Sequence, residues 1–125
     1  MIKIDTSLIL LTYKGKIFLM HSDNSPIVKN AWCFIEGEKE KNKSLEESIF
    51  KKVEKETSLK LTAATLEQKC FYHAELTDEH VNNIQRDEGQ TLEFFTFREV
   101  EKLALTVSAA AFVTKYRDFL ENRAN

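Results

Sequence analysis

Charged residues in the segment 32–59 have the types and spacing that could bind phosphate or a cation. On a helix with 100° per residue, Lys52, Lys55 and Glu56 lie within an arc of about 100°. Lysine ammonium groups bind phosphate as point charges, whereas a glutamate carboxylate is an oxygen ligand of the kind that Mg²⁺ prefers. The segment therefore indicates a site for an anionic ligand or a divalent cation, or else an ordinary solvated helix face.

A helix over about residues 44–57 is expected to carry these side chains. Ser44 is a good N-cap, and Glu47 follows three residues later, as a capping box requires. Apolar residues then recur at helical spacing, which predicts one buried face. The residues of that face are Leu45, Ile49, Phe50 and Val53.

Strands are expected before and after this helix. Their β-prone or apolar segments are 6–12, 16–20, 32–35, 69–76 and 91–97, and Gly15 allows a hairpin turn between the first two. Loops or turns are expected at 22–31, 36–43 and 87–90, and short helical turns are expected after Thr77 and over 98–103. Apolar spacing from about Val107 predicts a terminal amphipathic helix. The order favours an α/β or α+β sandwich with a mixed sheet packed between helices.

The composition limits the classes of protein to consider. A chain of 125 residues with 42% hydrophobic and 30% charged residues is expected to form one ordinary globular domain. A net charge of −2 gives no bulk attraction to nucleic acid or to an anionic membrane, and no apolar run is long enough to span a bilayer. Cys33 and Cys70 have no metal-ligand spacing and are expected in the core of a cytoplasmic protein, and His73 is expected to be a structural strand residue.

Residues 32–59 resemble the central part of the Nudix (MutT-like) family, and 37–59 match the Nudix box in length and register. The positions with residue types common in that family are Trp32, Phe34, Gly37, Glu40, Ser44, Glu46, Glu47, Val53, Glu56, Thr57 and Leu59. The order of elements also agrees over nearly the whole chain. The resemblance implies a Nudix-type α/β/α sandwich and hydrolysis of a nucleoside diphosphate derivative with Mg²⁺ or Mn²⁺.

The box is degenerate at the positions that the family uses for chemistry. Its three metal-ligand glutamates correspond to Lys52, Lys55 and Glu56, its arginine to Lys51, and its loop glutamate to Lys43. At these five positions the family pattern has four glutamates and an arginine, net −3. This chain has four lysines and a glutamate, net +3. A divalent cation would be repelled where the family attracts it.

Two hypotheses follow from this mismatch. The chain is a Nudix hydrolase with an impaired or rewired site, in which Glu56 joins Glu36 or Glu40 as metal ligand and Glu88, in a later turn, acts as base or ligand. Alternatively, it is an inactive Nudix-fold module that binds a nucleotide, another diphosphate-containing small molecule or a protein partner. In that case the residues expected to bind phosphate are Lys43, Lys52 and Lys55, with the box loop at Gly37. A homodimer is the default expectation for its assembly.

Overall fold

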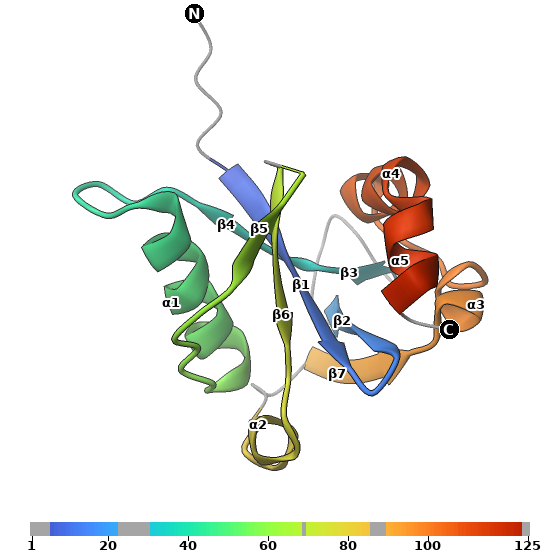
Figure 1. Ribbon diagram of the computed structural model, residues 1–125, viewed down its shortest axis with the longest axis horizontal. Coiled ribbons are helices and arrows are strands. Elements are labelled where there is room, and N and C mark those ends of the chain that lie inside the picture. Colours follow the sequence, from blue (N-terminus) through green and yellow to red (C-terminus); the bar gives the residue numbers. More distant parts are fainter. Residues whose placement is uncertain (1–5, 23–30, 69, 86–89, 124–125) are drawn as a thin grey trace, which may run out of the picture.

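A mixed sheet lies between two layers of helices in the computed structural model, which describes residues 6–22, 31–68, 70–85 and 90–123 (Figure 1). The strands are β1 Thr6–Tyr13, β2 Lys16–Ser22, β3 Trp32–Cys33, β4 Ile35–Glu38, β5 Thr65–Glu67, β6 Phe71–Glu75 and β7 Gln90–Phe95. The helices are α1 Leu45–Thr57, α2 Asp78–Asn82, α3 Phe97–Val100, α4 Val107–Lys115 and α5 Arg117–Arg123. In these described residues, no helix has the length and apolar character needed to cross a membrane.

Strand β1 is the centre of the sheet. It pairs antiparallel with β2 and β4 and parallel with β6, while β2 also pairs antiparallel with β3 and β7, and β6 with β5. The β1–β2 hairpin turns through Lys14 and Gly15, whose φ angles are 45° and 75°. Two successive positive φ angles are typical of the tight turn that matches the twist of a hairpin. The predicted hairpin is therefore confirmed.

Alternation along the strands builds two separate cores. On β1, Leu8 and Leu10 face one side of the sheet and pack with apolar residues of α3, α4 and α5. Ile9 and Leu11 face the other side and pack with α1 and with residues around α2. Figure 1 shows α1 on one side of the sheet and α3, α4 and α5 on the other. The predicted sandwich of helices around a mixed sheet is confirmed.

Helix α1 begins and packs as the sequence predicts. The Oγ of Ser44 accepts a hydrogen bond from the backbone N–H of Glu47 at 3.1 Å. The Glu47 carboxylate accepts a hydrogen bond from the same hydroxyl at 3.2 Å. In the expected capping box, this carboxylate would instead accept from the backbone N–H of Ser44. Ile49 and Val53 are fully buried, and Leu45 and Phe50 pack partly buried beside them.

Several boundaries differ from the prediction because backbone pairing and caps decide them. Residues 36–38, expected in a loop, continue from Ile35 as β4, since β1 offers backbone groups for pairing there. Phe97 begins α3 rather than ending a strand, because Thr96 caps that helix together with Glu99. The terminal helix is interrupted at Tyr116. Within the expected 22–31 loop, residues 23–30 lie outside the described residues; of the expected 87–90 turn, only Gln90 is described, and it begins β7.

The cysteine prediction is wrong in one respect. Both cysteines are free, but Cys70 is exposed in the turn before β6, whereas Cys33 is half-buried. The expectation for His73 is confirmed, because its Nε2 lies 2.7 Å from the Oγ1 of Thr12, which donates its own proton to Glu75. The shared hydroxyl therefore accepts from His73 and fixes the ring in β6. Burial lowers the pKa of His73.

Replacing Ser58 with glycine is expected to stabilise the protein by about 0.5 to 1 kcal/mol, because a side chain in the left-handed region is strained. Ser58 ends α1 with φ at 66° and donates its backbone N–H to the carbonyl of Glu54. Urea unfolding followed by circular dichroism measures the difference. The matched control is Ser108→Gly inside α4, which should destabilise, because glycine is unfavourable in a helix interior. A destabilised Ser58→Gly variant would contradict the strain argument.

Candidate functional site

A cavity of about 1180 Å³ lies between α1 and α4, where β4 and the start of β1 form its floor. The helix α1 contributes one wall, and α4 on the opposite face of the sheet contributes Phe112 and Lys115 to the other. The charged residues that line the cavity are Lys51, Lys52, Lys55, Lys115, Glu36, Glu38, Glu40 and Glu54. The cavity thus joins the box segment to a wall from the far end of the chain.

The cavity brings together five of the candidate site residues named from the sequence, and Lys51, at the position of the box arginine, lines it as well. The five are Glu36, Gly37, Glu40, Lys52 and Lys55. Lys43 and Glu56 do not line the cavity, although each makes an ion pair with a residue that does. Glu88 lies outside the described residues. Sequence reasoning missed the α4 wall, since nothing near the box indicates which distant helix faces it.

Gly37 of β4 lies close against Ile49 of α1. A Cβ atom at this position would lie 3.1 Å from Cγ1 and 3.4 Å from Cα of Ile49. Ile49 is fully buried, so it has little room to move. The glycine therefore allows the strand to lie against the helix, and this packing sets the distance between Glu36, Glu38 and the α1 lysines.

Ser48 anchors the loop that connects β4 to α1. Its Oγ accepts a hydrogen bond from the backbone N–H of Glu40 at 2.8 Å and donates one to the carbonyl of Ser44 at 2.9 Å. The backbone N–H of Lys43 donates to the carbonyl of Glu40 at 3.1 Å. Because Ser48 is only 4% exposed, these bonds are shielded from water and hold the backbone of Glu40 in place.

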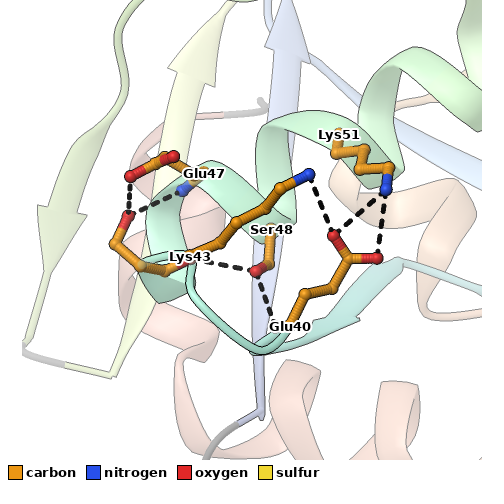
Figure 2. Close-up of polar contacts among 6 residues, drawn as sticks. Glu40, Lys43, Glu47, Ser48 and Lys51 are labelled. Carbon is orange, nitrogen blue, oxygen red and sulfur yellow. Dashed lines mark hydrogen bonds and ion pairs between the residues drawn. The ribbon is translucent and has the colours of Figure 1, made fainter.

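The carboxylate of Glu40 binds two lysines. Lys51 Nζ lies 3.3 and 3.2 Å from its two oxygens, and Lys43 Nζ lies 3.3 Å from one of them. Figure 2 shows the lysines reaching Glu40 from the helix and from the loop. Hydrogen bonds from Lys51 and Lys43 hold the pKa of Glu40 below its usual value, and the same carboxylate raises the pKa of Lys51. The carboxylate of Glu40 and the ammonium group of Lys51 are therefore both charged at neutral pH.

Glu56 makes a second ion pair on the same helix. Lys52 Nζ lies 3.2 Å from its Oε1, one helical turn away, and the Glu56 side chain is only 9% exposed. Burial raises the pKa of the nearby Cys33 thiol, with further contributions from the carboxylates of Glu36 and Glu56. Lys55 is exposed in the last turn of α1 and has no ion-pair partner in the described part of the chain.

These side chains do not fit a hard divalent cation such as Mg²⁺ or Mn²⁺. Such ions need several oxygen ligands, usually carboxylates. Of the carboxylates that the sequence offered as metal ligands, Glu40 and Glu56 are in ion pairs with lysines. Among the described residues, no three histidine, cysteine or acidic side chains form a group that could hold a metal ion. The residues that surround these carboxylates carry positive charge instead.

Comparison with known proteins identifies the fold. The sequence matches no protein-family profile and no curated protein. The structure is similar to the Nudix domain of Shewanella oneidensis NrtR complexed with ADP ribose, with a TM-score of 0.68, 14% identity and coverage of 96% of this chain and 90% of that one. It is also similar to a C. elegans Ap4A hydrolase, with a TM-score of 0.68, 13% identity and coverage of 94% and 98%.

A third similar structure is a mutT/nudix family protein from Listeria innocua, with a TM-score of 0.66, 18% identity and coverage of 94% of this chain and 93% of that one. The likeness extends over nearly the full length of every chain named. At identities this low, it establishes the arrangement of helices and strands and leaves the chemistry to the residues of this chain.

Proposed function

Because the chain has the Nudix fold, we propose that it binds a nucleotide or another diphosphate-containing small molecule. We further propose that its metal-dependent hydrolysis of this ligand is slow or absent. One observation carries the second half of this proposal. The ammonium group of Lys52 lies 3.2 Å from Glu56, the one carboxylate left among the three box positions that bind metal in the family.

The charge around Glu56 opposes a divalent cation. Lys52 neutralises the carboxylate, and Lys55 follows three residues later with a second ammonium group. Like charges at about 4 Å repel by about 1 kcal/mol in water and about 4 kcal/mol near a protein surface. A cation with two charges would meet this repulsion from each lysine that it approached. Without a cation, these residues lack an activator of water, since a protonated lysine is no general base.

The cavity supports the binding half of the proposal. Its volume of about 1180 Å³ lies somewhat above the range of about 300 to 1,000 Å³ that is usual for small-molecule sites, and it is large enough for a nucleotide. Lysines on both walls supply donors for phosphate, with Lys55 from α1 and Lys115 from α4. Two similar structures are a domain with bound ADP ribose and an Ap4A hydrolase, so nucleotide-derived ligands are the first class to test here.

A rewired hydrolase is the second candidate, and one observation favours it. Glu36 and Glu56 are close enough for both carboxylates to raise the pKa of the Cys33 thiol. Each carboxylate therefore lies near Cys33, and two carboxylates brought onto one cation would begin a metal site. For this site to form, Lys52 would first have to leave Glu56, a rearrangement that binding of substrate would have to drive.

Thermal shift and AMP formation, measured together on ADP and ADP-ribose, test the proposal. We expect both ligands to raise the unfolding midpoint in EDTA, and no AMP to appear when Mg²⁺ or Mn²⁺ is added. Lys52→Gln with Lys55→Gln should remove most of the ligand-induced shift, because these lysines supply the positive charge. Metal-dependent AMP formation that Glu56→Gln abolishes would establish the rewired hydrolase instead, and a chain that binds neither nucleotide would refute both.

A further inference from the structure

The ion-paired Glu40 lies in the wall of the same cavity as the lysines that would bind phosphate. We propose that Glu40 is an internal competitor of the phosphate ligand: it holds Lys43 and Lys51 and keeps the affinity of the cavity for diphosphates low. This inference rests on the proposed function, because it concerns how the same site is regulated.

The geometry makes Glu40 a stand-in for a bound anion. Its two oxygens accept from Lys51 Nζ at 3.3 and 3.2 Å, and one of them also lies 3.3 Å from Lys43 Nζ. Two ammonium groups on one small oxyanion are the arrangement that a phosphate group would receive. Figure 2 shows that both lysines point toward this carboxylate, one from each side.

The loop backbone keeps the competitor in place. Ser48 accepts the backbone N–H of Glu40 at 2.8 Å, and Lys43 donates its own backbone N–H to the Glu40 carbonyl. The Glu40 side chain is therefore attached to an ordered turn. Whenever its ion pairs with Lys43 and Lys51 break, the carboxylate stays near both lysines and can form the pairs again. Its effective concentration is high, as for any tethered ligand.

Charge gives the direction of the effect. Glu40, Lys43 and Lys51 together carry +1, whereas the two lysines alone would carry +2. The carboxylate occupies the donors that a diphosphate needs and repels the diphosphate as well. Removing the negative charge of Glu40 should therefore strengthen the binding of diphosphates. The opposite result is expected where a carboxylate itself binds the ligand, because its removal then weakens binding.

The exposure of these groups limits the size of the effect. The side chains of Lys51 and Glu40 are 60% and 45% exposed, and that of Lys43 is 39% exposed. Ion pairs exposed to this degree change an equilibrium by a few-fold each. We therefore expect Glu40→Gln to bind ADP and inorganic pyrophosphate about threefold to tenfold more tightly than the wild type.

The experiment is calorimetric titration of ADP and pyrophosphate in EDTA at low salt, on the full chain and its variants. The matched control is Glu54→Gln. Glu54 lines the same cavity on α1 and loses the same charge, but its side chain holds no lysine in the described part of the chain. We expect it to gain less than twofold. Glu40→Gln combined with Lys51→Gln should lose most of the gain, because the released lysine is then absent.

The outcomes separate this inference from the proposed function. Equal gains in Glu40→Gln and Glu54→Gln would show an effect of net charge alone and would overturn the inference. Weaker binding in Glu40→Gln would also overturn it, since Glu40 would then be positioning the lysines for the ligand. In both cases the wild type still binds diphosphates and the proposed function stands. If neither wild type nor variants bind, the proposed function fails, and the inference fails with it.

Discussion

Val53→Asp is expected to leave no folded protein at neutral pH. Val53 is fully buried and belongs to the core between α1 and the sheet, where it packs in one cluster with Ile35 and Ile49. The substitution removes apolar contacts and introduces a charge with no partner, at a cost of several kcal/mol. This is comparable with the entire stability of a typical domain, about 5 to 15 kcal/mol. Far-ultraviolet circular dichroism and gel filtration report the loss of structure.

Two further variants show whether the charge causes this result. Val53→Ala leaves a small cavity without a charge and should stay folded while losing about 2 kcal/mol in urea unfolding. Glu54→Asp places an aspartate at the next position after 53, on the exposed face of α1, and it should change the free energy of unfolding by less than about 0.5 kcal/mol. If Val53→Asp folds with near wild-type stability, the assignment of α1 to this core is wrong.

The triple variant Lys51→Arg, Lys52→Glu and Lys55→Glu is expected to create binding of Mg²⁺ and metal-dependent hydrolysis where the wild type has little or none. It rebuilds the Arg-Glu and Glu-Glu pairs of the box that the sequence resembles, and it lowers the charge of this helix face by four units. Two new carboxylates would join Glu56 in place of the ammonium group of Lys52, and such an oxygen-rich set is the kind that Mg²⁺ requires.

Calorimetry with Mg²⁺ alone and release of nucleoside monophosphate from a panel of nucleoside diphosphate derivatives measure the two effects. We expect this release to rise at least tenfold above that of the wild type. The matched control, Lys51→Arg with Lys52→Gln and Lys55→Gln, removes the same lysines without adding carboxylates, and it should bind no Mg²⁺. Wild-type turnover at typical enzyme rates, about 1 to 10³ per second, would refute the inactive-module proposal.

The sequence by itself determined α1 and the layers around it. Caps and apolar periods are local properties, so Ser44 and the spacing of Ile49 and Val53 predicted the helix that the structure shows. The same local logic predicted the β1–β2 hairpin, since a glycine tolerates the positive φ angle that a short turn between apolar strands requires. The lysines at 51, 52 and 55 were also visible, because their register against the box does not depend on folding.

The tertiary structure alone decided what those lysines meet. Glu40 was a candidate metal ligand on sequence grounds, yet the path of the loop, held by Ser48, turns its carboxylate toward Lys43 and Lys51. Lys115 and the rest of α4 reach the cavity from the far end of the chain. Contacts between residues so distant in sequence depend on how strands and helices pack. One such packing is that of β4 on α1 at Gly37, where an added Cβ atom would lie a few tenths of an ångström too close to Ile49, and no local pattern encodes this distance.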